Sequence, residues 1–173
     1  MIPRPASEDY SPYFAGYIGR VPEGDIVELL RRQQADMSSL LSALPADKLT
    51  YRYAEGKWSV AELIGHIADT ERVMSYRLLR VARGDRTPLP GFDQDAFIAG
   101  ADFDEWSLEA LAAEYEAVRR ATLSLIQRLP ERAFGFRGIV SGRETTAAAL
   151  AYVIAGHELH HVDALRRLYL EAK

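Results

Sequence analysis

The chain has 173 residues, a formal net charge of −4 and a pI near 5.6. Its hydrophobic content of 48% and charged content of 27% are typical of a globular protein, so we expect a single domain over residues 1–173. The acidic balance argues against a nucleic-acid partner, because nucleic-acid-binding surfaces are normally basic. The chain has no cysteine, which excludes disulfides, thiolate ligands and a cysteine nucleophile.

The first 22 residues are expected to form an arm. They contain four prolines together with Tyr10, Tyr13, Phe14 and Tyr17, too many prolines for one helix and too many aromatics for a disordered tail. We expect short helical turns that cover the core rather than enter a site. The segment lacks the apolar stretch of a signal peptide, and no apolar run in the chain approaches a membrane span of about 18 residues. A cytoplasmic protein without a membrane partner is therefore expected.

Two long helices are predicted in the first half of the chain. The first covers about residues 24–44, where Gln33 interrupts an apolar seam and faces either a polar part of the interior or the edge of the stripe. The second begins at Ser59, which with Glu62 has the spacing of a capping box, and it ends near Gly84. His66 lies about two turns into this helix.

A long connection, residues 84–106, separates the second helix from the third. Its length suits a crossover that runs the length of a bundle, and such long loops often have a functional reason. Asp93, Gln94 and Asp95 either approach a metal site with polar side chains or organise turns. Asp69, on the preceding helix, is either a ligand or hydrogen-bond acceptor for the His66 imidazole or a solvated charge.

The second half of the chain predicts two further helices. One begins after Ser107 and ends before Pro130, and the other covers about residues 147–169 with Thr145 as its expected cap. Residues 135–146 between them are expected to be a loop with a brief extended piece at 137–140. Four amphipathic helices of this length bury their seams best as an all-α four-helix bundle.

The last helix carries two histidines on its apolar seam. His157 and His161 lie one turn apart, where their side chains face the bundle interior, and His160 falls about 60° to one side, nearer to solvent or a subunit contact. Buried imidazoles must satisfy both ring nitrogens, and a divalent ion satisfies two such rings at once. The alternative is a pair of hydrogen-bonded core histidines.

The position of His66 extends this argument to three ligands. If the second and fourth helices run antiparallel, His66 near the start of one lies level with His157 and His161 toward the end of the other. Three nitrogen ligands with an open fourth position are typical of a catalytic metal site.

With these residues placed, the chain resembles the DinB-like superfamily of metal-binding four-helix bundles. The resemblance lies in Lys57–Asp69, in the segment from Gly84 to Asp95 and in Ala155–His161. It implies an up-down-down-up bundle, a homodimer, and a divalent ion held by His66, His157 and His161: zinc or nickel, with iron or manganese as alternatives. It also implies a small-molecule substrate and, in some relatives, a low-molecular-weight thiol such as bacillithiol or mycothiol.

His157–His161 also matches the H-E-x-x-H signature of zinc proteases, in which the glutamate is a general base. Only 12 residues follow His161 and none is a histidine, so the third ligand would be His66 and proteolysis is disfavoured. Glu158 remains a candidate base together with Asp69, Asp93 and Gln94, although it lies off the seam and a surface carboxylate is expected.

Three functional hypotheses follow. The first is a metal-dependent enzyme, either a thiol-dependent S-transferase or a hydrolase, in which the ion lowers the pKa of a thiol or water ligand. The second is a non-catalytic dimeric bundle whose metal has a structural or sensing role. The third is a metal-free interaction domain with hydrogen-bonded histidines.

Overall fold

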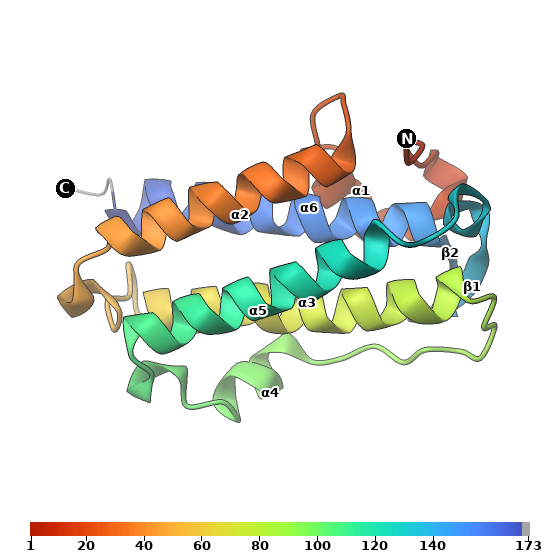
Figure 1. The fold of residues 1–173 in the computed structure, drawn as a ribbon. Helices are drawn as coiled ribbons and strands as arrows, with labels where there is room; N and C mark the ends of the chain where they lie inside the picture. The colour runs from red at the N-terminus through yellow and green to blue at the C-terminus, as the bar shows by residue number, and fades with distance from the viewer. Residues whose placement is uncertain (171–173) are drawn as a thin grey trace.

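Four long helices form the bundle in the computed structural model, which describes residues 1–170 (Figure 1). Their bounds are Ile26–Ala43 for α2, Val60–Ala82 for α3, Leu108–Ile126 for α5 and Ala147–Ala164 for α6. Figure 1 shows α3 and α5 running in one direction, and α2 and α6 in the other. The predicted all-α bundle with up-down-down-up order is confirmed. α3 packs against both α5 and α6, and α2 packs against the same two helices.

Side-chain caps define where these helices begin. The capping box predicted at the start of α3 is present: the Ser59 N–H donates to a Glu62 carboxylate oxygen at 2.7 Å, and Ser59 Oγ accepts from the Glu62 N–H at 3.0 Å. α6 begins differently from the prediction. Thr146 caps it by accepting from the Ala149 N–H at 3.2 Å, whereas Thr145 belongs to a strand and pairs with Gly138.

A small antiparallel hairpin connects α5 to α6. β1, Arg137–Val140, was expected as an extended piece, but β2, Arg143–Thr146, was not. The turn between the strands places Ser141 and Gly142 at φ of 50° and 79°. This left-handed backbone favours glycine and is typical of tight two-residue hairpin turns. The hairpin reverses the chain so that α6 runs back beside α3.

The crossover between α3 and α5 has more structure than a loop. Leu89 forms an isolated bridge with Val140 of the hairpin, and α4, Gln94–Ala99, packs against α3. The Asp93 carboxylate caps α4 by accepting from the Asp95 and Ala96 N–H groups at 3.0 and 3.1 Å. The crossover is therefore held at a fixed place along α3.

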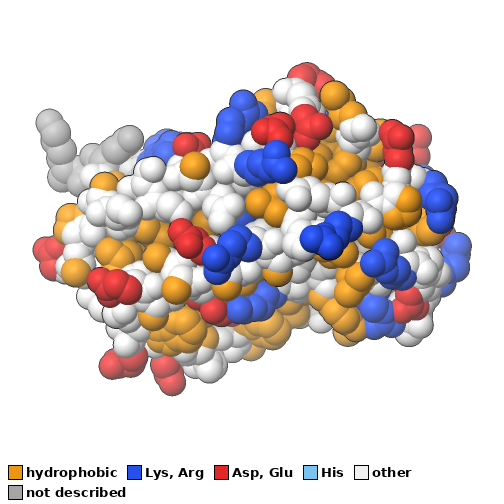
Figure 2. Space-filling view, viewed as in Figure 1, with side chains coloured by type: hydrophobic (Ala, Val, Ile, Leu, Met, Phe, Trp, Pro, Cys, Tyr) orange, Lys and Arg blue, Asp and Glu red, His pale blue; other side chains and the backbone are white. Residues whose placement is uncertain are grey.

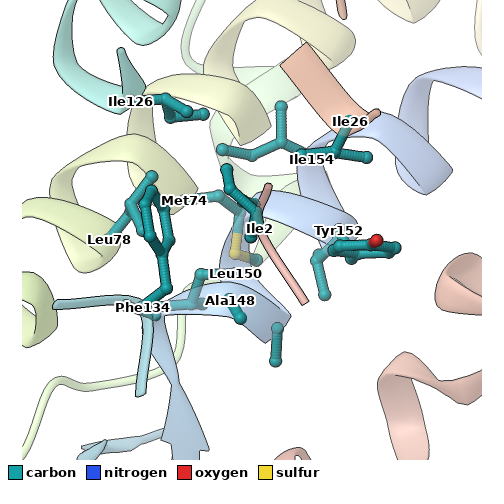
Figure 3. Close-up of a cluster of buried hydrophobic side chains, with 14 of the residues drawn as sticks. Ile2, Ile26, Met74, Leu78, Ile126, Phe134, Ala148, Leu150, Tyr152 and Ile154 are labelled. Carbon is teal, nitrogen blue, oxygen red and sulfur yellow. The ribbon is translucent and has the colours of Figure 1, made fainter. Parts of the chain in front are cut away.

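The N-terminal arm packs on the bundle as predicted. Its helical turn α1, Ala15–Ile18, lies against α6, and Ile2, Phe14 and Ile18 are buried. Figure 3 shows Ile2 among apolar side chains from α3, α5 and α6, including Met74, Ile126, Leu150 and Ile154. The arm thus completes the core.

The surface and the interior of the bundle differ as expected for a globular chain. On the face shown in Figure 2, basic and acidic side chains are interspersed among apolar and neutral ones.

Gln33 of α2 is buried inside the bundle. Its Nε2 donates to the Ala155 carbonyl at 2.8 Å, which places the side chain in the interior rather than at the edge of the apolar stripe. Among residues 1–170, no helix combines the length and apolarity needed to cross a bilayer.

Candidate metal centre

Three imidazoles meet between α3 and α6. The Nε2 atom of His66 lies 3.0 Å from Nε2 of His157 and 3.2 Å from Nε2 of His161. His157 and His161 are one turn apart on α6, and the antiparallel course of α3 brings His66 to their level, as the sequence predicted. The potential ligand atoms of all three residues lie within 4.8 Å of one another.

The convergence of three ring nitrogens on one point fits a divalent ion better than a hydrogen-bonded cluster. A tetrahedral ion with nitrogen ligands at about 2.0–2.1 Å places those nitrogens roughly 3.3 Å apart. A neutral imidazole has one N–H to donate, and the His66 Nε2 faces two other ring nitrogens at once. An ion placed among the three rings satisfies all of the converging lone pairs.

Burial keeps these rings in the form that binds metals. It lowers the pKa of His66 to about 4, with a contribution from His160, and that of His161 to about 3, with contributions from His66 and His160. Burial and the neighbouring histidines hold the pKa of His157 well below its usual value. Because neutral imidazole is the ligand form, the rings need no deprotonation near pH 7.

The second nitrogen of His66 faces a hydroxyl. Thr70, one turn further along α3, has its Oγ1 3.4 Å from the His66 Nδ1. A hydroxyl that accepts from Nδ1 leaves the Nε2 lone pair free for an ion. Asp69, the acceptor considered from the sequence, instead lies beside Arg72, with a carboxylate oxygen 3.8 Å from Nη1.

Glu158 is buried, and the prediction of a surface carboxylate is wrong. It is 3% exposed and accepts hydrogen bonds from Arg119 and from the Tyr115 hydroxyl, the latter at 3.0 and 3.1 Å. Arg119 also donates to both carboxylate oxygens of Glu71, at 2.9 and 2.8 Å. Burial raises the pKa of Glu158, and the Arg119 guanidinium opposes this shift. Glu158 is thus part of an ionic network between α3, α5 and α6.

A signal for this burial exists in the sequence. The ten residues from Ala147 to Gly156 contain no charged side chain, and every residue from Ala147 to Glu158 is buried. Such a helix is covered on all sides rather than along one seam. A carboxylate that follows this run is therefore expected to face another helix, and Arg119 on α5 supplies the opposite charge.

A cavity of about 460 Å³ adjoins the cluster at His157. Thr70, Met74 and Arg77 of α3 line it, together with residues of the arm, of the crossover and of α6. Asp93 and Gln94, which the sequence singled out, lie in its wall. The lining residues from outside α3 are Ser11, Tyr13, Phe14, Tyr17, Gly91, Phe92, Asp93, Gln94, Ser141, Val153 and His157.

A second cavity of about 410 Å³ adjoins the cluster at His161. His160 lines it with Trp58 and Tyr169, so His160 faces this space at the side of the triad. The Trp58 ring also covers His66, at 4.6 Å between ring centroids. The two cavities therefore reach different members of the triad: the first contacts His157 and the second contacts His161.

Residues 29–165 match the DinB superfamily, and this range contains all three histidines. The chain belongs to the DinB superfamily. It is also 31% identical over 147 residues to a protein of Oceanobacillus iheyensis named "Putative metal-dependent hydrolase", a match covering 80% of this chain and 82% of that protein.

Solved structures agree with this DinB fold. YfiT from Bacillus subtilis, described as "a probable metal-dependent hydrolase with an unusual four-helix bundle topology", has a TM-score of 0.74 at 16% identity, over 86% of this chain and 90% of its own. A mycothiol-dependent maleylpyruvate isomerase has a TM-score of 0.67 at 20% identity, over 84% of this chain and 62% of its own.

The N-terminal arm of this DinB protein precedes the matched range and yet contacts the histidines. The Tyr17 ring lies 5.3 Å from that of His157 and 5.6 Å from that of His160, measured between centroids. A Cβ at Gly156 would lie 2.1 Å from the Tyr17 carbonyl oxygen, so glycine permits this close approach. The arm was expected only to cover the core, but it also forms one wall of the site.

Proposed function

We propose that this chain is a metal-dependent enzyme that binds one divalent ion through Nε2 of His66, His157 and His161 and acts on a small molecule. The convergence of three neutral, largely buried imidazoles beside a cavity of about 460 Å³ supports this proposal. The names of the Oceanobacillus iheyensis relative and of YfiT, both described as metal-dependent hydrolases, agree with it.

If bound by these three histidines, a divalent ion would supply Lewis-acid chemistry and would lower the pKa of a water or thiol ligand. The chain's own residues orient the three rings around it. Thr70 faces the second nitrogen of His66, and the ionic network of Arg119 and Glu158 fixes the part of α6 that bears His157. Trp58 and Tyr17 cover the rings and limit the access of water.

Hydrolysis and thiol-dependent transfer are the two reactions that we consider. A hydrolase needs one organic substrate, whereas a transferase must hold a thiol and an electrophile together. The presence of a cavity on each side of the triad supports transfer as the second candidate. Since the chain has no cysteine, the thiol would come from a low-molecular-weight cofactor.

Activity assays with a metal-free control test the proposal. Untagged protein loaded with zinc or nickel, and in parallel with iron or manganese, is incubated with aryl esters, and separately with monochlorobimane and low-molecular-weight thiols. We expect turnover that chelation and His161→Ala both abolish. Thiol-independent turnover supports hydrolysis, and strict thiol dependence supports transfer. Equal turnover by the chelated protein would contradict the proposal, and bound metal without turnover would favour the non-catalytic alternative.

The homodimer is also a proposal, which rests on the family resemblance alone. Light scattering at several protein concentrations tests it. The proposal requires a mass near twice the 19.4 kDa of one chain.

A further inference from the structure

Arg77 is a buried cation with no carboxylate within ion-pair distance among the described residues. It is 3% exposed, and its guanidinium contacts the Pro90 carbonyl, 2.6 Å from Nη2, and the weakly accepting Met74 sulfur, 3.6 Å from Nη1. No ion pair within residues 1–170 includes it. Arg119, the other buried arginine within the described residues, is bound by two carboxylates.

The two arginines therefore differ in how their burial is compensated. Burial lowers the pKa of Arg77, whereas the carboxylates of Glu71 and Glu158 outweigh burial and raise that of Arg119. Buried charges are normally paired, because an unpaired one has lost its hydration without replacement. A guanidinium has five N–H donors, and the two protein contacts of Arg77 leave most of them available.

Arg77 lines the cavity that ends at His157. His66, Thr70, Met74 and Arg77 follow each other at spacings of four, four and three residues, so they share one face of α3. Thr70, Met74 and Arg77 all line the cavity. Arg77 lies eleven positions after His66, a rise of about 16 Å along the helix, and helical side chains tilt toward the N-terminus, here toward the histidines.

The space between Arg77 and His157 has mainly apolar walls. Phe14, Met74 and Val153 line it, and the Phe92 ring lies 5.6 Å from the Arg77 guanidinium. Among residues 1–170, the only acidic residue in the lining is Asp93, whose carboxylate already accepts two backbone N–H groups of α4. One cation at one end and apolar walls along the length suit a ligand with a single negative charge and an apolar body.

We propose that Arg77 anchors the carboxylate of a small organic acid, whose apolar body fills this cavity and whose other end reaches His157. A carboxylate accepts two parallel N–H bonds from a guanidinium, a geometry that lysine cannot reproduce. A dianionic phosphate would leave one negative charge uncompensated. That the bound acid is also the substrate rests on the proposed metal-dependent function.

Calorimetric titration with matched acids and amides tests this inference. The probes are the acids from phenylacetate to 5-phenylpentanoate and the corresponding primary amides, titrated into zinc-loaded protein. For the acid of best-fitting length, we expect wild type to prefer the acid over its amide by about 10- to 100-fold, as a charge-assisted hydrogen bond in a buried site implies. Arg77→Met should remove the preference and retain the zinc, and Arg77→Lys should reduce it.

Two further variants separate this inference from the metal proposal. Arg83→Met removes a charge from the exposed end of the same helix, outside the cavity, and should keep the wild-type preference. His161→Ala removes a proposed ligand that does not line this cavity, so it should lose zinc and still prefer acids. If wild type binds no zinc but still prefers the acid over its amide, and Arg77→Met loses this preference, the result would contradict the metal proposal alone.

Any one of three results overturns the inference. These are that no acid binds to wild type, that acid and amide bind equally well, or that Arg77→Met still prefers the acid over the amide. Circular dichroism checks that this variant folds, because Arg77 also contacts the crossover at Pro90. If Arg77→Met does not fold, Arg77→Lys decides the question. An unchanged preference in that variant overturns the inference, and a reduced one supports it.

Discussion

Arg119 on α5 donates a hydrogen bond to Glu158 on α6, the residue that follows His157. The same guanidinium binds Glu71 on α3 and the Leu30 carbonyl on α2, so one side chain contacts the other three helices of the bundle. Arg119 is fully buried. The position of His157 therefore depends on an ionic network in the core as well as on apolar packing.

Arg119→Met is expected to destabilise the fold by about 3–5 kcal/mol, because it leaves two buried carboxylates without their cation. The free energy of unfolding from urea denaturation measures this effect. Arg120→Met, which removes an exposed charge at the next position, should change it by less than about 0.5 kcal/mol. Equal effects of the two substitutions would contradict the role of the network.

Glu158→Gln separates a structural carboxylate from a general base. The amide keeps the size of the side chain but loses the charge that faces Arg119, so we expect a loss of about 1–3 kcal/mol in stability. Metal content should stay at the wild-type level, and turnover should fall by less than about tenfold. A loss of activity greater than about 100-fold at unchanged stability would assign Glu158 to the chemistry instead.

Thr70→Val is expected to weaken metal binding without unfolding the chain. The valine has a similar shape but cannot accept a hydrogen bond from the His66 Nδ1, and loss of such a partner typically costs about 10- to 100-fold in affinity. Competition with a chromophoric chelator measures the dissociation constant. Thr122→Val is the matched control, since the buried Thr122 hydroxyl has no hydrogen-bond partner within the described residues. Equal affinities of the two variants would contradict the role of Thr70.

Gly156→Ala should displace the N-terminal arm. The added methyl group would meet the Tyr17 carbonyl, a backbone atom that cannot rotate away, so we expect a loss of about 1–3 kcal/mol. Trypsin should then cleave faster after Arg20 than in wild type. Gly135→Ala, where no atom lies within 4 Å of the added carbon, should leave the cleavage rate unchanged. An unchanged rate in Gly156→Ala would show that the arm tolerates the shift.

The sequence predicted the fold and the histidine cluster because these depend on local signals. The helix that starts at Ser59 follows from its capping box, and the meeting of His66 with His157 follows from helical spacing and antiparallel order. The strand Arg143–Thr146 was not predicted, because it has only four residues and its burial does not alternate: the first two residues are exposed and the last two are buried.

The neighbours of the site were harder to predict, because they depend on contacts between distant parts of the chain. Glu158 was placed on the surface since one seam was assigned to a helix that is buried on all sides. The contact of Tyr17 with His157 joins residues 140 positions apart and depends on the absence of a side chain at Gly156. Arg77 is a charged residue on an apolar helix face. The sequence does not show whether such a residue has an ionic partner, and only its contacts in the structure do.

The most direct test of this account is the metal content of protein purified without a histidine tag and never exposed to chelator. Inductively coupled plasma mass spectrometry should give about one divalent ion per chain for wild type and for His160→Ala, and close to none for His66→Ala, His157→Ala and His161→Ala. Wild-type protein without a stoichiometric ion, or single-histidine variants that retain it, would contradict the central claim.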